Sequence, residues 1–361
     1  MLKKLSLAAL IAMGSMSVAS ATPLTDAIKG VDLGGMIRVR FYNENPDGAS
    51  SYNRWRTSSD FKFTIPVSEE LKLVYKLGVE GNVYGSNVPG KTSVVDPNPG
   101  ENLVFFKYAK NGFTALVGKI PVATPVTGSG HGEAHGAGAI ATYNFGNGFT
   151  LAGAFIGAVK ATDAVPVGVN NIYAIGGVYA NNAFGKVQAW YFNVDNIIDS
   201  DIVVSADLNF LKDAGVALHA DFATAELAAS GTDTQTYFNV SAKYSNDALC
   251  AQLGYAATGK DGGTVVLDAD APIVAVIPVG QIYNIANTTD EKAIYGKIGY
   301  NVDAKTNVYV SYVTTDNLGD DLTFGAKYKY NKKLGLSAYY SMKTDSAADN
   351  NEFRAEAKYS F

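Results

Sequence analysis

The chain ends in the ten residues EFRAEAKYSF, positions 352–361, in which polar and apolar side chains alternate at every step. Successive side chains of a β-strand point to opposite faces, so these residues predict a strand with one polar and one apolar face. The same alternation recurs over residues 321–330 and 334–342, and near the start over residues 37–41 and 60–65. The pattern predicts a sheet with one apolar surface and one water-facing surface.

The composition argues against a soluble core and against transmembrane helices. The 361 residues include 37 glycines, 22 tyrosines and 17 phenylalanines, and the mean hydropathy is close to zero. A membrane-spanning helix needs about 20 apolar residues in a row. The most apolar internal stretch, residues 273–279, is short and contains Pro278. A transmembrane β-barrel matches this profile, because each strand averages a lipid-facing and a water-facing side.

Short and long connections alternate between the predicted strands. The short ones carry turn residues, at 68–70, 111–112, 146–148, 181–182, 212–215, 246–247 and 331–333. The long ones are rich in Gly, Pro, Ser and Asp, at 43–52, 85–100, 121–136, 160–170 and 258–289. This pattern predicts an antiparallel up-and-down barrel with short periplasmic turns and longer extracellular loops.

The alternating segments number about eighteen. They are residues 31–42, 53–66, 71–84, 101–110, 113–120, 138–145, 149–159, 171–181, 184–194, 201–211, 216–225, 235–245, 249–257, 290–300, 306–315, 321–330, 334–343 and 352–361. Sixteen remain if the weak segments 138–145 and 201–211 are not strands. Backbone groups that face hydrocarbon must all be paired, so the sheet is expected to close. A barrel of this size encloses a water-filled lumen.

The N-terminus has the features of a secretory signal peptide. Lys3 and Lys4 precede an apolar run over residues 5–13, and Ala19-Ser20-Ala21 forms an A-x-A cleavage site. We therefore expect residues 1–21 to be removed and residues 22–361 to form one barrel domain. An exported barrel of this kind is expected in the outer membrane of a Gram-negative bacterium.

The charge balance and the cysteine count exclude several classes. The full chain has 29 basic and 34 acidic residues. Removing the signal peptide takes away two lysines, which leaves 27 against 34 and a net charge near −7. An acidic chain argues against nucleic-acid binding. The single Cys250 cannot form an internal disulfide, and three histidines do not suggest a metal-rich enzyme.

Charged residues on the water-facing phase are the main candidates for a functional site. The first three strands place Arg38, Arg40, Arg54, Arg56, Asp60, Lys62, Lys72, Lys76 and Glu80 on that phase. A basic wall opposite an acidic loop would set a transverse field across a constriction, and Glu133 is the best acid for that loop. Simple hydration of a polar wall is the alternative for any single residue.

Glu133 stands between two histidines in the third long connection, as His131-Gly132-Glu133-Ala134-His135. Two imidazoles and a carboxylate are plausible zinc ligands. However, the spacing differs from the helical H-E-x-x-H motif, and five nearby glycines oppose a helix. A flexible, pH-sensitive constriction loop is the preferred interpretation.

Two other classes of function remain open. His219 and Asp221 both fall on the water-facing phase, which suggests a hydrolase built into the barrel wall. Such an enzyme would need a nucleophilic serine positioned by His219, and no serine lies beside the two residues on the strand. An adhesin or structural barrel is the other class, with residues 258–289 as the most extensive binding surface. Residues 274–279 of that connection could alternatively pack on a neighbouring protomer.

A family resemblance adds to this interpretation. The segment from Ala21 to Asp32, followed by Gly35-Met36-Ile37-Arg38-Val39-Arg40-Phe41-Tyr42, resembles the major outer membrane porins of Campylobacter and its relatives. Weaker similarities to the family are found at Gly118-Lys119, at Thr264-Val265-Val266-Leu267-Asp268 and at the terminal Tyr359-Ser360-Phe361. The glycine- and histidine-rich third loop departs from the family.

The resemblance implies a trimeric, eighteen-stranded porin for ions and small hydrophilic solutes, with weak cation preference and the third loop folded into the pore. It requires no cofactor but suggests a structural calcium held by Glu133, Asp268 and Asp270. The implied partners are the lipid bilayer, lipopolysaccharide and the outer-membrane assembly machinery, which would read Tyr359 and Phe361 as a C-terminal signal.

Overall fold

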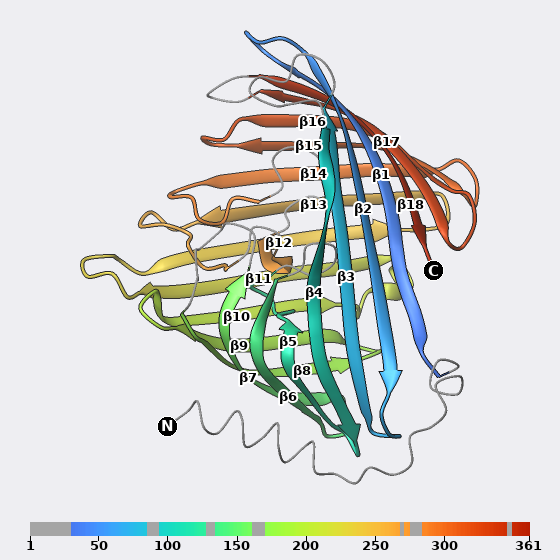
Figure 1. Ribbon diagram of the computed structural model, residues 1–361. Helices are drawn as coiled ribbons and strands as arrows, with labels where there is room; N and C mark the ends of the chain where they lie inside the picture. The colour runs from blue at the N-terminus through green and yellow to red at the C-terminus, as the bar shows by residue number, and fades with distance from the viewer. Residues whose placement is uncertain are drawn as a thin grey trace.

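The computed structural model describes residues 30–84, 94–127, 134–160, 170–267, 271–274, 284–344 and 349–361. The predicted signal peptide lies outside these ranges. Within them, eighteen antiparallel strands form a single sheet (Figure 1). The strands are β1 (Asp32–Pro46), β2 (Tyr52–Pro66), β3 (Leu71–Tyr84), β4 (Val94–Lys110), β5 (Phe113–Pro121), β6 (His135–Asn144), β7 (Phe149–Lys160), β8 (Ile172–Asn181), β9 (Gly185–Val194), β10 (Ile198–Leu208), β11 (Val216–Leu227), β12 (Gln235–Ser245), β13 (Leu249–Thr258), β14 (Lys292–Asn301), β15 (Thr306–Thr315), β16 (Asp320–Lys329), β17 (Leu334–Thr344) and β18 (Asn350–Ser360). Two short 3-10 helices, η1 (Lys212–Ala214) and η2 (Pro272–Val274), lie between strands.

The sheet closes on itself where the last strand meets the first. β18 pairs with β1 from Met36 opposite Ser360 to Pro46 opposite Asn350. Beyond this ladder, Gly35 N–H donates to the Phe361 carbonyl at 3.0 Å and Phe361 N–H donates to the Gly35 carbonyl at 3.1 Å. A Cβ atom at Gly35 would collide with the backbone carbonyl of Asp60, so the seam requires glycine. Every strand therefore has two neighbours, as a β-structure in hydrocarbon requires.

The predicted architecture is confirmed, with corrections at some strand ends. Segments 138–145 and 201–211 do form strands, β6 and β10, so the sixteen-strand alternative is wrong. β1, β2 and β4 extend into the predicted connections 43–52 and 85–100. β4 reaches back to Val94 through Pro97 and Pro99, and its pairing with β3 contains two register shifts. Prolines donate no ladder hydrogen bond and are tolerated at such irregularities, which made this part of the strand resemble a loop.

Apolar side chains cover the outside of the barrel, and more than half of the exposed aromatic ones lie at the short-turn end. Exposed rings at strand ends or turns there are Tyr108, Phe113, Tyr143, Phe145, Phe149, Tyr179, Phe184, Phe210, Tyr244, Tyr300, Tyr328, Tyr330 and Tyr359. Aromatic side chains favour the level of the lipid headgroups, so this ring of residues marks one membrane interface. No helix within the described ranges is long and apolar enough to cross a bilayer.

The short turns are held by asparagine and aspartate side chains. The Asn331 Oδ1 atom accepts N–H bonds from Lys333 and Leu334, both at 2.8 Å. Asp303 accepts the N–H groups of Lys305 and Thr306 in the same way, both at 2.7 Å. These two backbone bonds lower the pKa of the Asp303 carboxyl, because they favour its charged form.

Three inward aromatic rings lie directly over glycines of the neighbouring strand. The pairs are Trp190 over Gly176, Tyr295 over Gly254 and Tyr309 over Gly325, and a Cβ atom at any of the three glycines would collide with the ring. The rings therefore lie against the wall of the barrel.

One side of the interior is filled by an apolar cluster. Inner side chains of β4, β5 and β7 to β15, such as Phe192 and Tyr237, pack with buried residues of the connections after β5 and β13. Leu267 N–H donates to the Val126 carbonyl at 2.9 Å, and Ile273 N–H donates to the Pro125 carbonyl at 3.3 Å.

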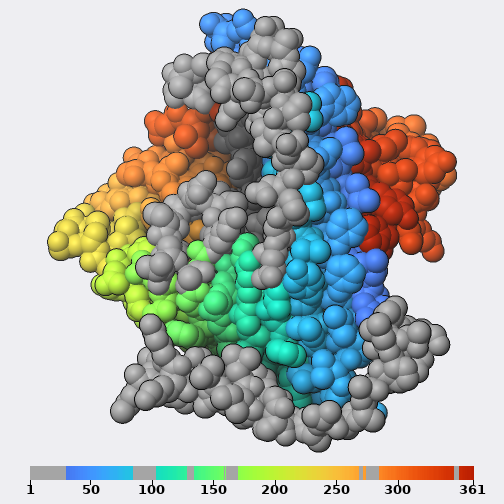
Figure 2. All heavy atoms as spheres, in the orientation of Figure 1, coloured from blue at the N-terminus to red at the C-terminus, as the bar shows by residue number. Residues whose placement is uncertain are grey.

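These contacts confirm that the third long connection folds inward, as seen in residues 122–127. The predicted packing of residues 274–279 on a neighbouring protomer cannot be compared, since nearly all of that stretch lies outside the described ranges. In Figure 2 the surface is hollowed between the blue N-terminal strands and the orange strands.

Replacing Leu267, whose side chain is 1% exposed, should release the inward-folded segment. We expect Leu267→Ala to cost about 3 kcal/mol of packing, and hence to accelerate protease cleavage within residues 259–291 about a hundredfold in the folded protein. Pro272→Ser, at an exposed position of the same connection, is the control. Equal cleavage rates for both variants would contradict the packing role.

Candidate functional site

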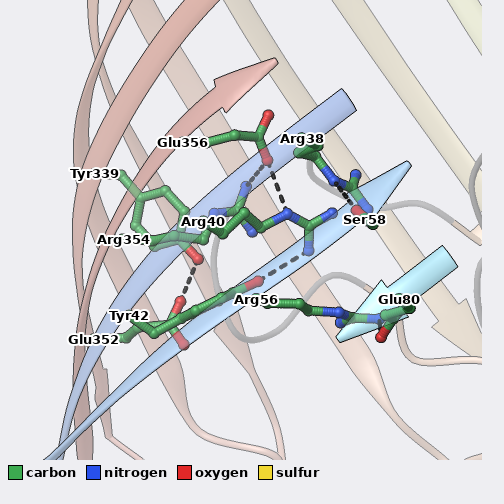
Figure 3. A network of polar contacts seen from close by, with 10 residues as sticks. All are labelled: Arg38, Arg40, Tyr42, Arg56, Ser58, Glu80, Tyr339, Glu352, Arg354 and Glu356. Carbon is green, nitrogen blue, oxygen red and sulfur yellow. Dashed lines mark hydrogen bonds and ion pairs between the residues drawn. The ribbon is translucent and has the colours of Figure 1, made fainter. Parts of the chain in front are cut away.

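The inner wall of β1, β2, β3, β17 and β18 carries a polar network (Figure 3). Arg38 and Arg40 point inward because they alternate along β1 with Ile37 and Val39, whose side chains are exposed on the outside. Cross-strand pairing keeps the same phase on β2 and β3, where Arg56 stands opposite Asn82 and Ser58 stands opposite Glu80. The network and the apolar cluster thus occupy different parts of the inner wall.

Arg40 connects the first strand to the last. Its Nε atom lies 2.9 Å from Glu356 Oε2 on β18, the residue paired with it across the seam. Its Nη1 atom donates to the Tyr42 hydroxyl at 2.9 Å. Glu356 also lies 3.8 Å from Arg354, whose guanidinium sits 4.8 Å from the centre of the Tyr339 ring. The Tyr339 hydroxyl donates in turn to Glu352.

A second group of ion pairs follows β2. Arg54 contacts Glu44 at 3.1 Å and stacks over the Tyr42 ring, with its guanidinium carbon 4.3 Å from the ring centre. Arg56 contacts Glu80 on β3 at 2.5 Å. Lys76 lies 3.6 Å from Asp60. The arginines are thus fixed by carboxylates and aromatic rings on the same wall.

The predicted basic residues are brought together, but the wall is not purely basic. Glu44, Glu352 and Glu356 lie among the arginines, and the sequence reasoning did not single them out as site residues. The inward phase of Glu352 and Glu356 was readable from the alternation in β18, whereas Glu44 fell in the predicted connection 43–52. The closed barrel implies that β1 and β18 are neighbours. The sequence does not reveal the pairing register of β1 and β18, and this register places Glu356 opposite Arg40.

Three predicted basic residues stand apart from the ion pairs. Arg38 donates to the Ser58 hydroxyl at 3.1 Å. Among the described residues, neither Arg38 nor Lys62 has a carboxylate within ion-pair distance. Lys72 is exposed near the short-turn end of β3, opposite Pro66 and Lys107, away from the network.

The loop residues of the predicted constriction are largely outside the described ranges. His131, Glu133, Asp268 and Asp270 all lie there, so the acid that was expected opposite the basic wall is not located. His135 is described: it is half-buried at the start of β6, opposite Pro121. Within the described ranges no cluster of three or more His, Cys, Asp or Glu side chains could hold a metal ion.

The His219 environment bears on the hydrolase alternative. Its Nδ1 atom lies 2.7 Å from Asp207 and its Nε2 atom lies 2.6 Å from Asp221. A histidine that activates a serine needs one ring nitrogen free to accept the serine proton. Both nitrogens of His219 contact carboxylates, so the arrangement differs from a catalytic triad although Ser241 is its cross-strand neighbour.

Comparisons with known proteins agree on the type of barrel. Residues 1–167 match the family described as Campylobacter major outer membrane protein. No curated protein matches the chain.

Among solved structures, Pseudomonas aeruginosa OccK9 (OpdG) superposes with a TM-score of 0.75 at 16% identity, covering 93% of this chain and 99% of that one. P. aeruginosa OccK5 (OpdH) superposes with a TM-score of 0.73 at 14% identity, covering 91% of this chain and 98% of that one. Acinetobacter baumannii OccAB4 superposes with a TM-score of 0.71 at 12% identity, covering 92% of this chain and 98% of that one.

These structures share the fold. We call the inward-facing Arg38, Arg40, Arg54, Arg56 and Arg354 the arginine wall, and the family match covers β1 and β2, which carry the first four of them. Together with the closed eighteen-stranded barrel, they identify the chain as an outer-membrane porin of a Gram-negative bacterium, similar over residues 1–167 to the Campylobacter major outer membrane protein family.

Proposed function

We propose that the barrel lets ions and small hydrophilic solutes diffuse passively across the outer membrane, and that it is not an enzyme. The observation that carries this proposal is the divided interior. The apolar cluster fills one side, whereas Arg38, Asp60 and Lys62 of the opposite wall line a cavity of about 550 Å³, which Leu103 and Phe105 of the cluster border. Charged side chains along a wide lumen keep it hydrated, which passive diffusion requires.

We further propose a weak cation preference. The arginines favour anions only as far as their charge is uncompensated, and Glu44, Glu80 and Glu356 compensate Arg54, Arg56 and Arg40. Local pairing cancels most of the field of the wall at distances beyond the Debye length, about 10 Å at 0.1 M salt. The acidic excess of the whole chain, 34 acids against 29 bases, then sets the sign.

The assembly that we propose is a homotrimer inserted by the outer-membrane assembly machinery, in contact with lipid and lipopolysaccharide. The family resemblance supports the trimer. The terminal aromatic residues support the assembly signal. Phe361 also has a place in the fold, because its ring lies 6.0 Å from those of Phe61 and Tyr359. Chemical cross-linking in native membranes tests the trimer without altering this seam.

The main prediction concerns conduction. The refolded mature protein should produce stable, ohmic current steps in planar bilayers, because its lumen is lined by hydrated charges. Silence under conditions where the barrel is folded would favour an adhesin or structural barrel. Phospholipase and protease assays on the same preparation address the enzyme alternative directly, and turnover abolished by His219→Gln would support it.

Neutralising Arg38 should raise the cation preference, because this arginine has no carboxylate partner among the described residues. We expect Arg38→Gln to move the reversal potential in a potassium chloride gradient toward the cation value, and the Arg38→Gln/Arg40→Gln double variant to move it further. Lys260→Gln, at an extracellular lysine that is 85% exposed, is the control for charge. An identical reversal potential in all variants would contradict the role of the wall.

A structural calcium between the two inward-folded connections remains part of the proposal. The bond from Leu267 N–H to the Val126 carbonyl joins the segment preceding Asp268 to the loop that contains Glu133. Chelation should therefore accelerate proteolysis of residues 259–291, and Asp268→Asn should reproduce this effect with chelator absent. Elemental analysis showing no calcium in the purified native protein would contradict the site.

A further inference from the structure

Lysines are concentrated on one side of the short-turn end of the barrel. Six of them lie on the turns and strand ends of β14 to β18: Lys305, Lys327, Lys329, Lys332, Lys333 and Lys358. All six side chains are exposed to water. Elsewhere on the same end the lysines are scattered: Lys72 lies at the start of β3, Lys110 is paired with Glu70 at 3.0 Å, and Lys212 lies beside Asp213 on the β10–β11 turn. The turns at 111–112, 145–148 and 182–184 contain no charged residue.

The fold brings the six lysines around one cavity. Ser360 N–H donates to the Lys333 carbonyl at 2.8 Å, which fixes the β16–β17 turn beside the end of β18. Lys329 N–H donates to the Lys305 carbonyl at 2.8 Å, which joins the β14–β15 turn to the same group. The cavity has a volume of about 960 Å³, and Lys327 and Lys358 enter it from the inner wall. We call it the lysine vestibule.

The positive charge of the lysine vestibule is largely uncompensated. No ion pair joins any of the six lysines to an acid in the part of the chain that the structure describes. Three acids, Asp247, Asp303 and Glu356, line the cavity against the six lysines. Asp303 accepts the N–H groups of its own turn, and Glu356 is bound to Arg40 at 2.9 Å. This contrasts with the arginine wall, where carboxylates neutralise most cations.

The basic surface continues from the vestibule into the lumen. A second cavity, of about 550 Å³, shares Lys358 and Ser360 with the first. Its other charged lining residues are three cations, Arg38, Lys62 and Lys76, and two acids, Asp32 and Asp60, and Asp60 lies 3.6 Å from Lys76. Arg38 and Lys62 have no carboxylate partner among the described residues. An anion that enters from the short-turn end therefore meets cations from the rim to Arg38.

We propose that the lysine vestibule binds multivalent oxyanions of the phosphate type and that a bound anion obstructs the channel from this end alone. Lysine ammonium groups bind phosphate as point charges, and low-dielectric walls concentrate their field. The proposal rests on the proposed function, since obstruction presupposes conduction. The opposite end of the same wall offers no comparable site, because Arg54 and Arg56 are paired with Glu44 and Glu80.

Tripolyphosphate added to one side at a time tests the proposal in single channels at about 0.1 M salt, where charges still interact over about 10 Å. We expect reversible block from one side only. The Lys327→Gln/Lys358→Gln variant should weaken the apparent affinity about tenfold, since each exposed charge contact contributes a modest share. Each of the single variants Lys327→Gln and Lys358→Gln should weaken the block, whereas Lys212→Gln, an equal charge change on the β10–β11 turn, should leave the block unchanged.

Equal block from both sides, or unchanged block in the double variant, would overturn the proposal. If the native protein does not conduct, the proposed function fails and the vestibule is tested separately. Calorimetric titration of the folded, detergent-solubilised protein with tripolyphosphate should then show saturable binding that Lys327→Gln/Lys358→Gln weakens. Absence of saturable binding would overturn the inference independently of conduction.

Discussion

Closure of the backbone hydrogen-bond ladder between β18 and β1 is the constraint on which the rest of the structure depends. An unpaired strand edge in hydrocarbon would leave a row of amide and carbonyl groups without partners, each costing several kcal/mol by order of magnitude. The seam satisfies these groups from Gly35 to Pro46 on β1. A mismatch of one residue at the seam would turn every side chain of β18 to the wrong surface.

The same seam creates the central part of the polar network. Arg40 and Glu356 are separated by 315 intervening residues, yet they are direct cross-strand partners. Their ion pair, with Tyr42, Arg354 and Tyr339 around it, exists only in the closed barrel. Closure and the charge of the lumen wall are therefore determined by one set of backbone pairings.

Alternation of polar and apolar residues was sufficient to predict the fold, because one period of two positions sets both faces of every strand. β3, β12 and β15 have the predicted limits, since the alternation ends where turn- or loop-forming residues begin in the sequence. Prediction failed at β4, where prolines and register shifts disguise a continuing strand. The inward direction of Arg38 to Glu80 was likewise readable, whereas their partners were not. The partner of Arg40 depends on the register across the seam, which no local pattern encodes.

The interior shows how one barrel can hold a dry region and a wet region together. The connections after β5 and β13 bring Val126, Leu267 and Ile273 against inner residues such as Phe192, so a wall that would be poorly hydrated is covered by the chain itself. The remaining wall keeps its charges in water. By filling one side of the lumen, these connections confine the open space to the charged side of the wall.

Glycines beneath the inward aromatic rings have a consequence for the bore of the barrel. Trp190, Tyr295 and Tyr309 lie back only because Gly176, Gly254 and Gly325 leave room for them. One added methyl group at Gly325 would tilt the Tyr309 ring into the lumen, and one at Gly176 or Gly254 would push Trp190 or Tyr295 into the apolar cluster. The width of the lumen therefore depends on glycines that have no side chain. A single-base change at such a glycine codon can narrow the lumen without replacing any residue that lines it.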